Sequence, residues 1–135
     1  AAVIGDERFI APAVDLTKNG SPTTRARAAS VLAGSGDPST APALIDLLSD
    51  QSREVRAASA RGLSKLGCWP ASAQIEPLLS DDDQDVRREA ARALCGLGAP
   101  GMVLLQVNSR GVGRSAQTAS QMLQINSLGA MTEAA

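Results

Sequence analysis

One pattern recurs along the chain at a fixed spacing of 31 residues, and this period constrains the fold more than any other feature. Its clearest copies are residues 50–67 (DQSREVRAASARGLSKLG) and 81–98 (DDDQDVRREAARALCGLG), and residues 19–36 are a weaker copy. Four positions of the pattern recur at this spacing: Asn19, Asp50 and Asp81; Arg25, Arg56 and Arg87; Leu32, Leu63 and Leu94; Gly36, Gly67 and Gly98. A period of this size is typical of a solenoid, in which each unit buries its apolar face only against its neighbours.

Apolar residues follow helical spacing twice within each unit, which predicts two helices per repeat. The second helix is expected to begin after a capping residue, Ser21, Ser52 or Asp83, whose side chain can accept an amide hydrogen bond. It is expected to end at the recurring glycine, which tolerates a left-handed backbone. The predicted fold class is therefore all-α, an α-solenoid of stacked antiparallel helix hairpins.

The period places four repeats in the chain, and the last of them is degenerate. Its second helix matches best at a shorter offset of 28 residues, which sets Ala119 on Ala91, Met122 on Leu94 and Ile125 on Leu97. The expected boundaries are 1–5 for the end of a preceding repeat, 6–36, 37–67 and 68–98 for repeats one to three, 99–126 for repeat four and 127–135 for a loosely held tail. A start inside a repeat predicts that the chain is part of a longer one. Pro12 and Pro42 are expected near the start of a first helix, where proline is tolerated. Pro77 should kink or shorten its helix.

Composition argues against several classes of function. Thirteen lysines and arginines stand against 14 acidic residues, so no overall field attracts a polyanion and no nucleic acid is expected. No apolar stretch approaches the roughly 20 residues that cross a bilayer, so no membrane is expected either. Histidine is absent, which removes the commonest general base and zinc ligand. We therefore expect a protein without catalysis, cofactor or metal, and the two cysteines fit a cytoplasmic location.

An acidic cluster at residues 81–85 is similar to the start of a calcium-binding loop. Such a loop needs glycine at its sixth position and glutamate at its twelfth, but this chain has Val86 and Arg92 there. We interpret the cluster instead as capping the following helix and compensating its dipole.

The chain resembles a known family, the short HEAT-like repeats of the phycobilisome-lyase type. The resemblance is carried by residues 47–50 (LLSD), 54–58 (EVRAA) and 63–67 (LSKLG), and again by residues 78–81 (LLSD) and 86–98 (VRREAARALCGLG). It implies an α-solenoid whose usual work is holding other proteins.

The resemblance leaves more than one function open. It extends to bilin lyase subunits, to deoxyhypusine hydroxylase and to superhelical alkylpurine DNA glycosylases. The hydroxylase needs His–Glu pairs for iron, and this chain has no histidine. The glycosylase needs a basic groove with aromatic residues, whereas this chain has a net charge of −1 and one tryptophan. The leading hypothesis is a noncatalytic protein-interaction scaffold that binds a partner segment on its concave face. The alternative is a bilin lyase or lyase-chaperone subunit, and a nucleic-acid-binding module is a weaker one.

The resemblance also implies a structural ladder in which arginines bridge carboxylates along the stack. The expected members are Asn19, Arg25, Asp50, Arg56, Asp81 and Arg87, with Asp50 and Asp81 as acceptors. The planar fork of arginine suits this role because it can hold two acceptors at once. The alternative for these arginines is anion binding.

The second helices are expected to present a partner-binding strip on the side opposite their apolar residues. The strip comprises Ala26, Ser30 and Ala33, then Ala57, Arg61 and Ser64, then Arg88, Arg92 and Cys95. It becomes cationic toward repeat three, which favours an acidic segment of a protein partner, although an ordinary solvated face would look the same. Trp69, in the loop entering repeat three, is either a hydrophobic lid or an exposed anchor for the partner.

Overall fold

The structure is a computed structural model that describes the backbone of residues 7–134 and the side chains of residues 10–129. The described elements are α1 (Glu7–Asn19), α2 (Pro22–Gly34), η1 (Pro38–Thr40), α3 (Ala41–Leu47), α4 (Arg53–Lys65), η2 (Trp69–Ala71), α5 (Ser72–Ile75), η3 (Glu76–Ser80), α6 (Gln84–Gly96), α7 (Ala99–Ser109) and α8 (Arg114–Ala134). No strand occurs between residues 7 and 134, which confirms the all-α fold class. The residues expected to end a preceding repeat, 1–5, lie outside the described part.

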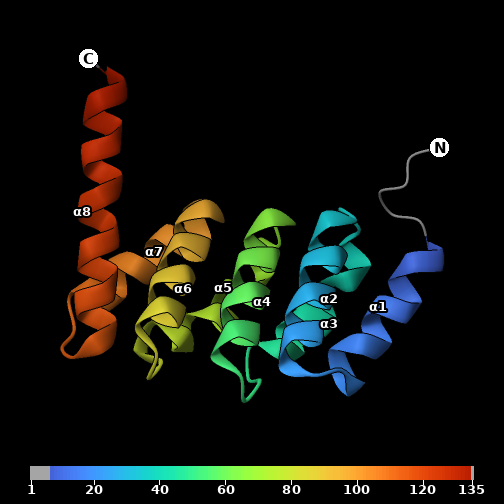
Figure 1. The fold of residues 1–135 in the computed structure, drawn as a ribbon. Coiled ribbons are helices and arrows are strands. Elements are labelled where there is room, and N and C mark those ends of the chain that lie inside the picture. Colours follow the sequence, from blue (N-terminus) through green and yellow to red (C-terminus); the bar gives the residue numbers. More distant parts are fainter. Residues whose placement is uncertain (1–6, 135) are drawn as a thin grey trace.

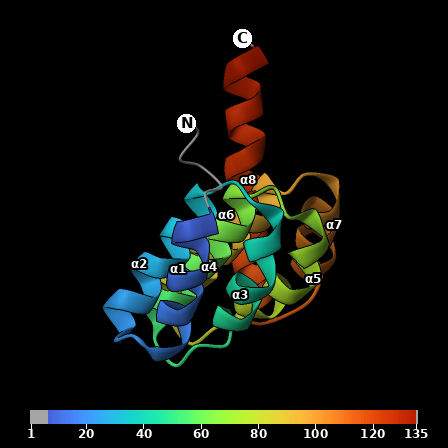
Figure 2. The same cartoon turned by 90° about the vertical axis from the view of Figure 1, so that its right-hand side faces the viewer.

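The helices pack neighbour to neighbour along one direction. Helix α2 packs on α4, α4 on α6, and α6 on α8, so the second helices form a row that is seen from the side in Figure 1. Figure 2 shows α3, α5 and α7 as a second row beside the first. Helices α1 and α8 lie at opposite ends of this stack (Figure 1). This arrangement confirms the predicted α-solenoid.

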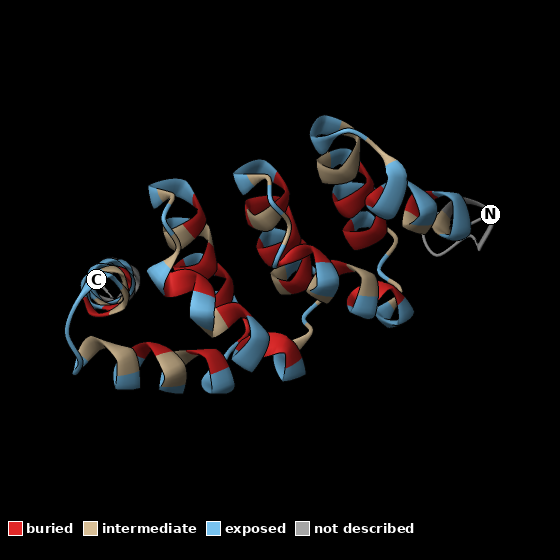
Figure 3. Cartoon of the chain, turned by 90° about the horizontal axis from the view of Figure 1, so that it is seen from below, coloured by how far each residue is buried: buried red, intermediate tan, exposed pale blue. Residues whose placement is uncertain are grey.

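The core runs along the stack because each hairpin contributes the same leucine to it. Leu32, Leu63 and Leu94 recur at the period and are fully buried. One continuous cluster of buried residues joins them to Leu44 and Leu79 of the first helices. Figure 3 shows the buried residues where helices face one another and the exposed residues on the outer sides.

The ends of the second helices follow local backbone chemistry. The side chain of Ser21 accepts a hydrogen bond from the Thr24 amide, and Asp83 accepts one from the Val86 amide, as predicted for caps. Helix α4 begins directly after Ser52, as predicted, but the side chain of Ser52 makes no capping bond. The glycines that end these helices have positive φ angles, as the C-terminal signal predicted: 71° at Gly36, 68° at Gly67 and 82° at Gly98.

Prolines shape the first helices in two ways. Pro77 ends the short α5, and the chain continues as the 3₁₀ helix η3, which confirms the predicted break. Pro42 lies at the start of α3, also as predicted. Pro12 lies inside α1, so its predicted place near an N-terminus was wrong. Helix α1 starts at Glu7, earlier than the apolar pattern alone indicated.

The last hairpin differs from those before it. Ala119 and Met122 of α8 are buried as the shorter offset of 28 predicted, but Ile125 is 62% exposed. The segment from residue 127, expected to be a loosely held tail, continues α8 as a helix to Ala134. Helix α8 therefore extends well beyond the other second helices (Figure 1). Between residues 7 and 134, no helix combines the length and the apolar character that crossing a membrane requires.

Candidate functional site

A groove of about 600 Å³ crosses the three second helices α2, α4 and α6. Its lining residues are Thr23, Ala26, Arg27, Ser30, Arg53, Glu54, Ala57, Ala58, Arg61, Asp83, Asp85, Arg88, Glu89 and Arg92. Ala57 and Ala58 are buried at its base. Small side chains at these positions leave room between the neighbouring helices, and charged side chains surround that room.

The groove is built from the same four positions of each repeat. Twelve of its lining residues fall into the sets 23, 54 and 85; 26, 57 and 88; 27, 58 and 89; and 30, 61 and 92, each spaced by 31 residues. Positions spaced by three or four on a helix share one face, so each second helix contributes one face to the groove. The period could therefore have identified Thr23, Glu54, Asp85 and Glu89, which the predicted strip omitted.

The predicted strip is more balanced in charge than expected. Arg61 Nε and Arg92 Nη1 each lie 3.5 Å from an oxygen of Glu89, and Arg88 Nη1 lies 3.8 Å from Asp85 Oδ1. All three arginines line the groove, but so do these carboxylates. The expectation of a purely cationic end is thus corrected, because Glu89 joins the arginines of two neighbouring helices.

Both charges are exposed in the groove, with arginines in slight excess: five arginines line it against four carboxylates, and the side chain of Asp85 is 82% exposed. The side chains of Arg61 and Arg92 are 64% and 63% exposed, whereas that of Glu89 is 21% exposed. Arg53 is likewise 68% exposed and pairs with Asp83, which is 17% exposed. The carboxylates of these pairs are recessed behind their arginines, whereas Glu54 and Asp85 are exposed, so a molecule that enters the groove meets these arginines and two carboxylates.

Three predicted strip residues, Ala33, Ser64 and Cys95, do not line the groove. Ala33 and Ala57 are buried, because second helices in a stack contact neighbours on both sides. Ser64 lies beside α6, where a Cβ added to Gly96 would come within 2.6 Å of the Ser64 Oγ, and lines a smaller hollow with Arg61. Cys95 faces α8 and donates a hydrogen bond of 3.4 Å to Asn126 Oδ1.

Trp69 is 60% exposed at the start of η2 and is not among the residues that line the groove. It is therefore no lid over the repeat junction. Both cysteines are free.

Paired charges join consecutive hairpins beside the groove. Arg25 donates from Nε and Nη2 to the two carboxylate oxygens of Asp50, at 2.8 and 3.0 Å, and from Nη1 to the carbonyl oxygen of Gly20 at 2.7 Å. One repeat later, Arg56 binds Asp81 in the same way, at 2.8 and 3.1 Å, and donates to the Asp50 carbonyl oxygen at 2.7 Å. Each arginine thus ties its own loop to the next one.

The first and last expected members of the ladder differ from this pattern. The exposed Asn19 donates a hydrogen bond to the carbonyl oxygen of Asp15, in its own helix, and is not hydrogen-bonded to an arginine. Arg87 donates from Nη1 to the carbonyl oxygens of Asp81 and Asp82, at 2.7 and 3.1 Å. No carboxylate among the described residues pairs with it.

The junctions shift the ionisation of their members. Burial opposes ionisation of Asp50, but the bonds from Arg25 and the Ser52 amide, with the charges of Arg25 and Arg56, outweigh it and hold the pKa of Asp50 below its usual value. The hydrogen bond to Asp50 raises the pKa of Arg25. The Val86 amide lowers the pKa of Asp83, with Arg53 adding to the effect.

The acidic cluster is already engaged in these contacts. Asp81 binds Arg56, Asp83 binds Arg53 and the helix start, and Asp82 binds Arg114. Within the described part of the chain, no three metal-ligating side chains come together. The geometry is that of loop and helix-cap contacts.

The comparisons with known proteins identify the repeat. A family model described as HEAT repeats matches residues 10–95, which is more than half of the chain. None of the curated proteins compared with the chain matches it. The family match confirms the HEAT-like resemblance and does not single out the phycobilisome-lyase type.

Proposed function

Because the chain belongs to the family of HEAT repeats, which generally mediate protein–protein interaction, we propose that it is a noncatalytic scaffold that binds a segment of a partner protein. The proposed binding surface is the groove across α2, α4 and α6. One observation carries the proposal: the groove uses the same four positions of three successive repeats, so it is a linear surface with a regular period.

The dimensions of the groove favour an extended segment. Packed helices lie about 9 Å apart, so three second helices span roughly 28 Å including the width of one helix. An extended chain rises about 3.3 Å per residue, so about eight residues would cross the groove. A segment of that length could contact every repeat, whereas a single side chain would contact only one.

Charge favours an acidic segment. The exposed guanidinium groups of Arg53, Arg61 and Arg92 stand above their recessed carboxylates. Acidic side chains of a partner could bind these groups without first breaking the pairs, because arginine has five donors and can hold two acceptors.

The test is affinity capture with a double charge reversal, Arg61→Glu with Arg92→Glu, from a lysate of the source organism. The matched control is Lys18→Glu with Arg110→Glu, which changes net charge equally at exposed positions outside the groove. We expect the groove variant to lose the captured protein and the control to retain it, with circular dichroism showing both folded. Retention by the folded groove variant would refute the proposal and direct attention to Trp69.

A further inference from the structure

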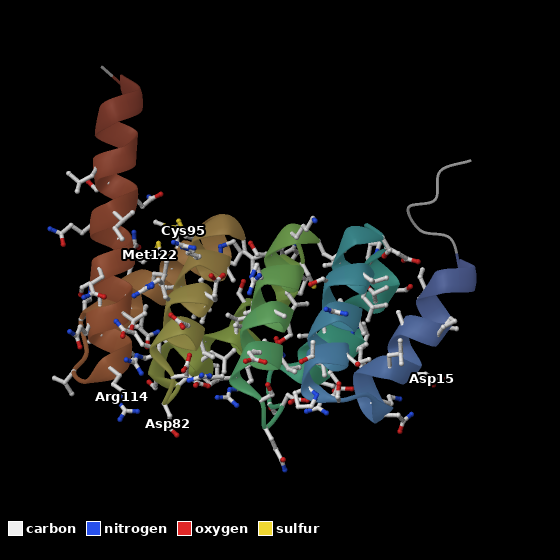
Figure 4. The ribbon with its side chains drawn as sticks, in the orientation of Figure 1. Asp15, Asp82, Cys95, Arg114 and Met122 are labelled. Atoms are coloured by element: carbon white, nitrogen blue, oxygen red, sulfur yellow. The ribbon has the colours of Figure 1, made fainter. Side chains whose placement is uncertain are left out.

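A second cavity of about 340 Å³ lies between α6 and α8, next to the groove, with which it shares Arg88 and Arg92. Two contacts connect these helices: Arg114 Nη1 lies 3.0 Å from Asp82 Oδ1 near their N-terminal ends, and Cys95 binds Asn126 further along. Figure 4 labels Asp82, Arg114, Cys95 and Met122 along this junction. The cavity is therefore part of the packing between the last two second helices.

Arg87 lines this cavity, and only its Nη1 donates hydrogen bonds among those to described residues. Its Nη1 holds its own loop as in Arg25 and Arg56, at the same 2.7 Å. In those two residues the Nε and Nη2 edge grips both oxygens of an aspartate 25 positions later. Position 112 is a valine that is 93% exposed, and no carboxylate in the described part of the chain takes that place. The loop bonds fix the guanidinium, so this edge is preorganised for a carboxylate.

Two further arginines line the cavity, and no carboxylate lines it with them. Arg88 stands where α4 has the small Ala57, and Arg92 stands where α4 has Arg61. Arg61 meets Glu89 of the next helix, but at the offset of 28 that aligns α8 with α6, the corresponding residue is Gln117. Three arginines and no carboxylate therefore line the cavity. Both inner junctions contain the loop aspartate that this last one lacks, and the junction of α4 with α6 also contains Glu89.

We infer that the cavity between α6 and α8 is a carboxylate-binding site in which Arg87 grips the carboxylate and Arg88 and Arg92 supply additional positive charge. The ligand class is a small dicarboxylate or the acidic side chain of a peptide, which present the same chemical group. A volume of about 340 Å³ is at the small end of ligand pockets. Met122 lines the cavity and can contact the methylene groups between two carboxylates, and the Gln121 amide can donate a further hydrogen bond.

This site shares Arg88 and Arg92 with the proposed partner groove, but other residues distinguish the two. Arg87 and Gln117 line the cavity and not the groove, whereas Arg61 lines the groove and not the cavity. The variant Arg61→Glu should therefore leave carboxylate binding unchanged even if it abolishes partner capture. Failure of one proposal is thus distinguishable from failure of the other.

The test is a titration of the ¹⁵N-labelled chain, followed through the Nε–H resonances of its arginines. The probes are glutarate and a capped peptide, acetyl-Ala-Ala-Glu-Ala-Ala-Glu-Ala-Ala-amide, and neutral glutaramide is the control ligand. We expect a saturable shift of the Arg87 resonance with a Kd of about 1 mM, and none with glutaramide. Arg87→Gln should weaken binding at least tenfold.

Because Arg87→Gln also removes the loop bonds, a second variant tests the site with the loop intact. Gln117→Glu places a carboxylate on α8 that should compete with the ligand. We expect this variant to bind glutarate at least tenfold more weakly and to have a Tm about 3 °C higher. Gln124→Glu makes the same charge change outside the cavity and should alter neither quantity.

Saturation by glutarate would identify a small-molecule site, and saturation by the peptide alone a site for a protein side chain. Absence of a saturable shift with both probes overturns the inference. Equal glutarate binding by Gln117→Glu and Gln124→Glu does so too.

Discussion

Replacing Arg56 by alanine should be the most destabilising single change at a repeat junction. The Arg56 and Asp81 side chains are only 18% and 9% exposed, and two parallel hydrogen bonds join them. Arg56 also holds the carbonyl oxygens of Asp50 and Gln51. Breaking a buried pair of this kind costs about 3–5 kcal/mol, and partial exposure favours the lower end, about 3 kcal/mol. For 135 residues the unfolding entropy is about 0.28 kcal/mol/K, so Tm should fall by about 10 °C.

The assay is thermal unfolding by circular dichroism with two matched variants. Arg53→Ala removes another arginine from the start of the same helix. The Arg53 side chain, which pairs with Asp83, is largely exposed, so Tm should change by less than about 2 °C. Arg56→Lys keeps the charge but loses the fork, and Tm should fall by about half as much as with alanine. A double-mutant cycle with Asp81→Asn should give a coupling of at least about 1 kcal/mol. Equal Tm values for Arg56→Ala and Arg53→Ala would refute the reasoning.

Three further outcomes are expected from individual contacts. Gly101→Ala should be severely destabilising, because its Cβ would lie 1.7 Å from the Leu94 carbonyl oxygen, whereas Gly34→Ala meets nothing within 4 Å and should be neutral or slightly stabilising; urea unfolding compares them. Asp50 has a lowered pKa, so the stability it contributes is present above the ordinary aspartate pKa of about 3.9 and lost as the pH falls through the lower folded-state value; Tm should drop more steeply at acid pH than in Asp50→Asn. Millimolar calcium should leave Tm unchanged, and a rise would show that the acidic cluster binds metal.

The repeat period anticipated much of the fold because the same local chemistry recurs in each unit. Gly67 and Gly98 take the left-handed conformation that ends a helix, and the caps at Ser21 and Asp83 form as their side chains allow. These features depend on a few neighbouring residues. Pro12 shows the limit, since it lies inside α1, which begins five residues before it.

The site was less accessible to the same reasoning. A helical wheel assigns each residue to one of two sides, but a second helix in a stack has neighbours on both flanks, and this is why Ala57 is buried although it points away from the main apolar side. Glu89 precedes Arg92 by three positions, a spacing that predicts an ion pair, and attention to it would have corrected the expected cationic end. The cavity beside Arg87 depends on how α8 packs at its shifted offset, which no local pattern determines.

The central claim is that a partner lies across three neighbouring second helices, and thiol protection measures this directly. Ser30→Cys, Glu54→Cys and Asp85→Cys, each in a chain whose Cys68 and Cys95 are replaced by serine, place one thiol in the groove on α2, α4 or α6. The rate of maleimide modification would be compared with and without the captured partner. We predict slower modification at all three positions. Slowing at one position alone, or at none, would contradict the account.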